Sequence, residues 1–172
     1  MRWIKSVGCG LLAVAIVLSA VGCGPEAAKF SEPDLVSTVL SGTIDGHDYA
    51  FVSGTINKVT TPNGTSYVVG LKNYEWECGP NSPRPLPEPA LVVNFEVLER
   101  KAGLVEVSFA DGHGGAMQVN VDAAQIKTII VDDGLLRLDN WTTEAGQEVS
   151  GALVFEGANS TINGTFKATV CP

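Results

Sequence analysis

Residues 161–170 read TINGTFKATV, and this stretch decides the fold class of the chain. The apolar residues Ile162, Phe166 and Val170 stand at even positions, and polar residues, Lys167 among them, stand at odd ones. Successive side chains of a β-strand point to opposite faces, so the alternation predicts a strand with one buried face. Only one register buries the apolar set, and we therefore expect Phe166 in the core and Lys167 outside.

The same alternation recurs along most of the chain after Val36. It predicts strands near residues 36–44, 48–57, 65–73, 90–98, 103–110, 115–121, 126–131, 135–141, 148–156 and 161–170. Turn sequences separate these strands, with hairpin signals at Asp45-Gly46 and Asn63-Gly64 and further breaks at 101–103, 111–115 and Asp133-Gly134. Short strands at this spacing predict an all-β fold, either an antiparallel β-sandwich or an up-and-down β-barrel of about ten strands.

The N-terminus has the three parts of an export signal. Arg2 and Lys5 form a short positive region, an apolar run follows over 7–21, and the segment ends in Ala20-Val21-Gly22-Cys23. The apolar run is too short and ends too abruptly for a typical membrane-spanning helix. An ordinary secretory signal with a chance cysteine, or an uncleaved anchor, are the alternatives that the residues alone leave open.

Ala20-Val21-Gly22-Cys23 resembles the lipobox of bacterial lipoproteins, although that family prefers Leu where this chain has Ala20. The resemblance implies that Cys23 carries a diacylglyceryl group and becomes the mature N-terminus after cleavage. It divides the chain into a signal peptide (1–22), a lipidated N-terminus with a flexible tether (23–36) and a single all-β domain (37–172). The expected partner is a membrane of the bacterial cell envelope, and Gly24 weakly favours the outer one.

Composition supports a globular, acidic domain. The chain has 172 residues, of which 45% are hydrophobic and 17% charged, as is typical of folded rather than disordered proteins. Removing Arg2 and Lys5 with the signal changes the net charge from −8 to −10. An acidic domain repels phosphate backbones, so nucleic acid is not an expected partner.

The cysteine pattern predicts one disulfide. Of four cysteines, Cys9 leaves with the signal and Cys23 takes the lipid, which leaves Cys78 and Cys171 in an oxidising compartment. A metal pair is the rival, but two thiols lack further ligands at suitable spacing. The segment CGPNSPRPLPEP (78–89) contains five prolines and predicts a rigid crossover loop, with a polyproline II ligand as the alternative.

No catalytic motif is present, and the remaining candidates are single residues. His47 and His113 lie in turn sequences, Asp122, Asp132, Asp133 and Asp139 could offer oxygens to calcium, and Tyr74, Trp76 and Trp141 could stack on a sugar. Turn geometry and core packing explain these residues equally well, so no metal or cofactor is predicted. We expect a non-enzymatic module for binding or scaffolding; a lipocalin-like carrier of an apolar ligand and a hydrolase with dispersed residues are the alternatives.

Overall fold

A computed structural model describes residues 29–172 except 63, 80–85, 98–100, 108–113 and 123–124. The expected signal peptide, Cys23 and His113 lie outside the described residues. Among the described residues, no helix is long and apolar enough to cross a membrane.

The all-β prediction is confirmed. The described chain forms eleven strands and one short 3₁₀ turn, η1 (Glu32–Asp34). The strands are β1 (Ser41–Ile44), β2 (His47–Ala50), β3 (Ser53–Thr61), β4 (Gly64–Lys72), β5 (Ala90–Val97), β6 (Gly103–Val107), β7 (Gly115–Asp122), β8 (Gln125–Ile130), β9 (Asp133–Leu138), β10 (Glu148–Gly157) and β11 (Ser160–Val170).

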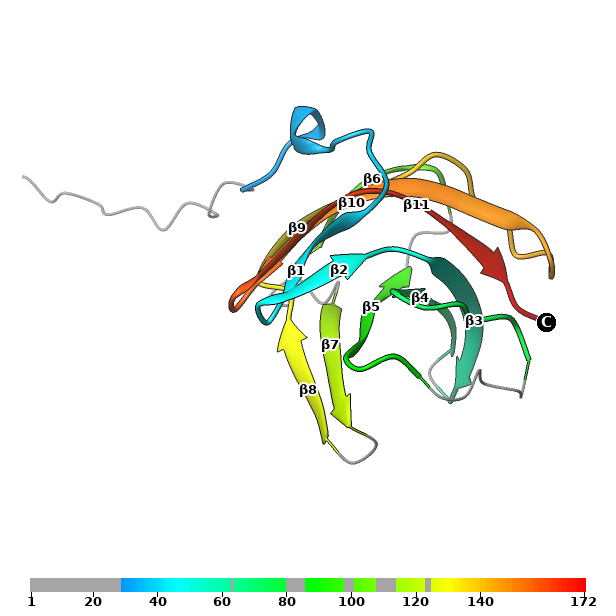
Figure 1. The fold of residues 1–172 in the computed structure, drawn as a ribbon. Coiled ribbons are helices and arrows are strands. Elements are labelled where there is room, and N and C mark those ends of the chain that lie inside the picture. Colours follow the sequence, from blue (N-terminus) through cyan, green and yellow to red (C-terminus); the bar gives the residue numbers. More distant parts are fainter. Residues whose placement is uncertain (1–28, 63, 80–85, 98–100, 108–113, 123–124) are drawn as a thin grey trace, which may run out of the picture.

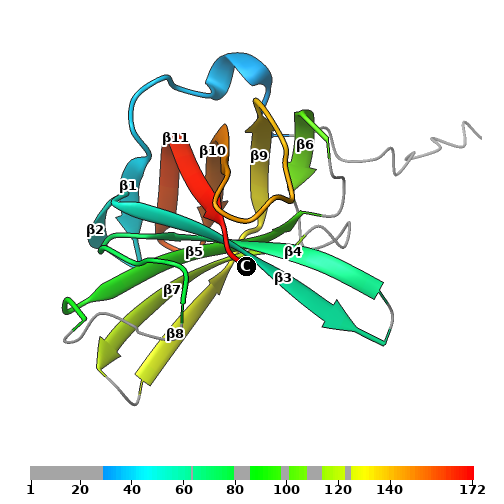
Figure 2. The same cartoon turned by 90° about the vertical axis from the view of Figure 1, so that its right-hand side faces the viewer.

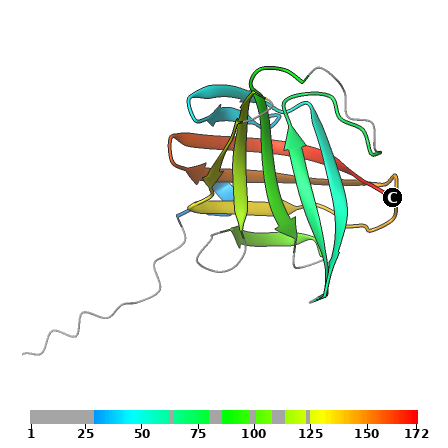
Figure 3. The ribbon, with the colours of Figure 1, turned by 90° about the horizontal axis from the view of Figure 1, so that it is seen from below.

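All strands belong to one sheet that curls into two layers (Figure 1). Its main path runs β6-β9-β10-β11-β3-β4-β5-β7-β8, and β1 joins β11 and β2 beside that path. The upper layer holds β9, β10 and β11, and the lower layer holds β3, β4, β5, β7 and β8. The lower strands pass across the upper ones when the molecule is seen from the side or from below (Figures 2 and 3). The result is a half-barrel.

One edge of β11 pairs with β10, and its other edge pairs with two different strands. β1 pairs antiparallel with its beginning, where Gly42 lies opposite Ile162. β3 pairs with its end, where Thr55 lies opposite Thr169, and this contact is parallel. The expectation of a purely antiparallel sheet therefore fails at this junction, which joins the two layers.

Two chain segments cross directly from one layer to the other. The predicted strand 48–57 is broken in two, because the Phe51 amide donates to the Leu40 carbonyl while the Val52 amide donates to the Lys72 carbonyl. The second crossing is similar. The Val131 amide donates to the Gly115 carbonyl in β7, and the Asp132 amide donates to the Glu156 carbonyl in β10. A strand that changes partners must bend, and alternation alone does not reveal the bend.

Three phenylalanines fill the space between the layers. The Phe95 ring lies 5.7 Å from that of Phe155 and 5.9 Å from that of Phe166, each pair edge to face. Relative exposures of the three side chains are 2%, 0% and 3%. Edge-to-face pairs add about 0.5–1.5 kcal/mol each beyond area burial. The register predicted for β11 is confirmed, because Ile162 and Val170 are also buried and Lys167 is exposed.

Each of these phenylalanines is paired with a glycine on the adjacent strand. Phe155 of β10 is paired with Gly134 of β9, and Phe166 of β11 is paired with Gly151 of β10. Phe95 of β5 is paired with Gly115 of β7. A Cβ built on Gly134 would lie 2.6 Å from Cδ1 of Phe155. The prediction of a turn at Asp133-Gly134 is therefore wrong: both residues belong to β9, and the glycine makes room for an aromatic ring.

The described part of the expected tether is bound to the domain. Lys29 forms an ion pair with Glu156. Oε1 of Glu32 lies 3.8 Å from Nη1 of Arg137. Asn163 of β11 accepts a hydrogen bond from the Val36 amide at 3.2 Å and donates to the Asp34 carbonyl at 2.8 Å. The short helical turn η1 lies above the upper layer (Figure 1). Residues 29–36, which the sequence assigns to the tether, therefore contact β9, β10 and β11.

Candidate functional site

The structure scatters most of the sequence-based candidates. His47 is exposed at the start of β2, Asp132 is exposed at the layer crossing, and Asp139 pairs with Arg137 at 2.8 Å. Within the described ranges, no three His, Cys, Asp or Glu side chains gather as metal ligands. Trp141 packs edge to face against Tyr67, with ring centroids 5.6 Å apart. These residues do not form one site.

Tyr74 and Trp76 do come together, on the segment that follows β4. Their rings meet edge to face at a centroid distance of 6.0 Å, and both side chains are partly exposed. Ser53 donates a hydrogen bond of 2.6 Å to the Tyr74 carbonyl and fixes this segment to β3. Asn73 accepts from the Leu91 amide at 2.8 Å and donates to the Pro89 carbonyl at 3.2 Å. The aromatic pair is thus held over the outer face of the lower layer.

Trp76 covers a buried lysine. Lys72 is only 8% exposed, and its Nζ lies 5.3 Å from the centroid of the Trp76 ring. Nζ donates to Oγ1 of Thr55 at 2.9 Å and to the Gly70 carbonyl at 3.3 Å. A Cβ on Gly70 would lie 3.2 Å from this Nζ and 3.2 Å from Oδ1 of Asn94, so the glycine leaves room for the ammonium group.

The environment of Lys72 is polar but neutral. None of the ion pairs formed among the described residues involves it, and its partners are a hydroxyl, a carbonyl and an aromatic face. Burial lowers the pKa of Lys72 from 10.5 to about 8, since removal from water disfavours the charged form. Burial also raises the pKa of Tyr74. A lysine buried at such a cost marks a candidate functional site.

Sequence analysis did not find Lys72. It stands at an outward position of its strand, where a lysine is ordinarily solvated, and only the segment after β4 covers it. The aromatic residues at 74 and 76 were the available signal. Chemically, the group offers an amine whose pKa is lowered to about 8, hydrogen-bond donors and an aromatic surface, with Thr55 and the Trp76 ring in contact with Nζ.

Replacement of Lys72 by methionine is expected to stabilise the domain at neutral pH. The pKa is lower in the folded state, so the unfolded chain binds more protons between about pH 8 and 10.5, and wild-type stability rises through that window. At pH 7 the K72M variant should gain on the order of 2 kcal/mol after allowance for solvent screening and two lost hydrogen bonds. Urea unfolding at several pH values measures the difference.

The stability gained by K72M relative to wild type should shrink steadily above pH 8 and be nearly absent at pH 10.5. Lys58→Met on the neighbouring strand β3 is the matched control, because Lys58 is exposed and its removal should leave the pH profile unchanged. A pH-independent difference between K72M and wild type would show that the ammonium group is solvated in the folded protein.

The disulfide holds the end of the Trp76 segment that lies away from β4, at Cys78. Cys78 and Cys171 are bonded at an S–S distance of 2.10 Å, as the cysteine pattern predicts. The Cys171 amide also donates to the Ile56 carbonyl at 2.8 Å. The covalent bond therefore ties the segment bearing Trp76 to the end of β11, beside the junction of the two layers.

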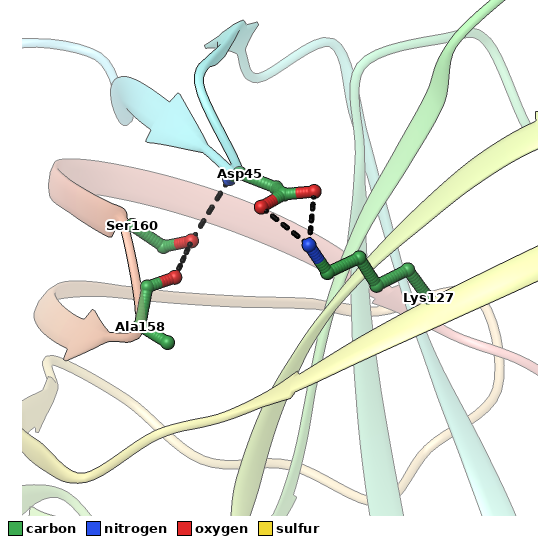
Figure 4. A network of polar contacts seen from close by, with 4 residues as sticks. All are labelled: Asp45, Lys127, Ala158 and Ser160. Carbon is green, nitrogen blue, oxygen red and sulfur yellow. Dashed lines mark hydrogen bonds and ion pairs between the residues drawn. The ribbon is translucent and has the colours of Figure 1, made fainter.

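A second polar cluster closes the opposite end of the domain (Figure 4). Lys127 of β8 donates to both carboxylate oxygens of Asp45 at 2.7 Å. The Asp45 amide donates to Oγ of Ser160 at 2.9 Å, and that hydroxyl donates to the Ala158 carbonyl at 3.1 Å. Asp45 and Gly46 have φ of 51° and 80°, which confirms the tight hairpin predicted there. The cluster cross-links the β1–β2 turn, the β10–β11 turn and strand β8, and it is structural.

The fold and these clusters define an all-β half-barrel with a disulfide-bound aromatic segment on its lower layer. No family model matches the chain, and neither a curated protein nor a solved structure matches it.

Proposed function

We propose that the chain is the precursor of a bacterial lipoprotein of the cell envelope. Its all-β domain is held outside the cytoplasm by acyl chains on Cys23 and serves in binding or scaffolding without catalysing a reaction. The lipobox-like residues Ala20 to Cys23 support the anchor. A residue with two or more acyl chains binds a bilayer stably, whereas one chain binds only marginally. Gly24 favours sorting to the outer membrane.

The packed interior between the layers is the observation that distinguishes a surface-binding module from a carrier of an apolar ligand. Phe95 packs edge to face against both Phe155 and Phe166 between the two layers. A carrier of an apolar ligand needs that volume for its cargo, and here side chains occupy it. The packing thus favours a module that acts through its surface over a lipocalin-like carrier.

The outer face of the lower layer is the surface best suited to such binding. Tyr74 and Trp76 give it a partly exposed aromatic pair. Asn94 of β5 lies opposite Gly70, next to the Lys72 ammonium group, and is joined to Gln118 of β7 by a 3.1 Å hydrogen bond. Aromatic faces and amides are the groups that bind neutral polar partners such as sugars and peptides, and the excess of acidic residues discourages anionic ones.

Cys23→Ser is expected to abolish lipidation and to move the protein from the membrane fraction to the soluble fraction. The thiol of Cys23 is the attachment point that the lipobox resemblance implies, and serine does not replace it. Intact-mass spectrometry of the purified protein measures the change. A mature chain that begins anywhere other than a lipidated Cys23 would contradict the proposal.

A further inference from the structure

We infer that the end of the domain formed by the β1–β2 and β10–β11 turns faces the membrane, and that the end with the disulfide faces away. The inference rests on the proposed lipid anchor at Cys23. It goes beyond that proposal because it assigns a membrane-facing surface and leaves the Trp76 segment free for a partner.

The described chain begins at Lys29, next to the end of β10. Lys29 forms an ion pair with Glu156 at the end of β10, and Asp132 and Asp133 at the layer crossing also attract it. These carboxylates raise the pKa of Lys29, with the hydrogen bond to Glu156 as the largest cause. The start of the described chain is therefore held beside the β10–β11 turn.

The number of residues between Lys29 and Cys23 limits how far Lys29 can lie from the lipid. Lys29 follows Cys23 by six residues, which span at most about 20 Å when fully extended. The contacts of Glu32, Asp34 and Val36 with β9 and β11 prevent the segment behind Lys29 from lengthening the tether. The turn at Ala158 must therefore remain close to the bilayer surface.

The other end of the domain carries the disulfide. The chain end, the disulfide and the 139–147 connection all lie opposite the point where the described chain begins (Figures 1 and 3). A domain of about 140 residues has a radius of gyration of about 15 Å and so a diameter of about 40 Å. A tether of about 20 Å is too short for the domain to turn over and place the disulfide end on the lipid.

Charge determines how closely the end formed by the β1–β2 and β10–β11 turns approaches the membrane surface. Asp45 is paired with Lys127 and Glu156 with Lys29, and Asp132 and Asp133 add two further carboxylates near Lys29. An anionic surface repels these carboxylates, so we expect the near end to stand beside the headgroups without inserting into them.

The test compares two exposed alanines. Ala158→Cys lies in the near turn and Ala145→Cys lies in the far connection. With Cys23 lipidated and Cys78 bonded to Cys171, each added thiol is available for a maleimide donor dye, and labelled wild type serves as the blank. The full lipidated protein is placed on phosphatidylcholine vesicles that contain a headgroup-labelled acceptor lipid. We expect energy transfer at position 158 to exceed that at 145 several-fold.

Release of the docked segment provides the matched variant. Asn163→Ala combined with Glu156→Ala and Arg137→Ala removes the hydrogen bonds to Asn163 and both ion pairs of the segment, which lengthens the free tether, and the difference between the two positions should shrink. Equal transfer at both positions in the parent protein, or stronger transfer at 145, would overturn the orientation. Absence of vesicle binding would instead overturn the proposed anchor.

Discussion

Phe166→Ala is expected to lower the free energy of unfolding by about 3–5 kcal/mol, the range for removal of a buried aromatic side chain. The Phe166 ring is 3% exposed and contacts Phe95. It also lies over Gly151, where a built Cβ would be 3.0 Å from Cζ of the ring. A glycine has no side chain that can move into the space left by the ring, so we expect the cavity to remain and the cost to fall at the upper end of the range.

Lys167→Ala is the adjacent control. The Lys167 side chain is 69% exposed, and its Nζ lies 3.6 Å from the carboxylate of Glu148, which is exposed too. Exposed pairs contribute little, so the change should stay within about 0.5 kcal/mol. Urea unfolding at unchanged m-value compares the two variants. Similar midpoint shifts would mean that this segment is not a half-buried strand.

The strands were predictable wherever a strand keeps the same neighbours along its length. β11 and β7 alternate cleanly, and Ile162, Phe166, Met117 and Val119 are buried as their parity predicts. A one-residue slip would expose the whole apolar set, so the hydrophobic effect fixes the face of each strand through local sequence. The same holds for Asp45-Gly46, since a two-residue hairpin depends on only a few adjacent residues.

The features that the sequence did not reveal depend on distant partners. Gly134 resembles a turn residue until Phe155 is known to lie against it. The bend after Ala50 requires knowledge that Leu40 and Lys72 supply successive acceptors. The parallel contact of β3 with β11 joins residues more than 100 positions apart. Such pairings follow from the packing of the whole sheet and leave no periodic trace.

The candidate site was hidden for the same reason. Parity places Lys72 on the outer face of β4 correctly, but burial there comes from Trp76 and from the loop that the disulfide holds. The docked N-terminal segment is a second case. Its polar composition predicts a tether, whereas Glu156, Arg137 and Asn163 hold it through partners far along the chain.

Loss of the disulfide is expected to cost about 2–5 kcal/mol, as is typical of native disulfides in small secreted domains. Cys78 and Cys171 are separated by 93 residues, close to the 100-residue loop for which chain entropy predicts about 4.7 kcal/mol. The bond also holds the end of β11 beside β3, where the register contains only two residue pairs. Few hydrogen bonds secure this junction, so the covalent link carries much of its stability.

The double variant Cys78→Ala, Cys171→Ala measures the loss by urea unfolding, and it avoids the exposed thiol that either single variant would leave. Alkylation of native, unreduced wild type should label neither cysteine; labelling of both would contradict the bond itself. The variant also tests the link to the lysine site. Without the bond, the segment bearing Trp76 is held by the hydrogen bonds of Ser53 and Asn73 and by the contact of Trp76 with Lys72. We therefore expect Lys72 to gain water, its pKa to rise toward 10.5, and the stabilising effect of K72M at pH 7 to diminish in this background.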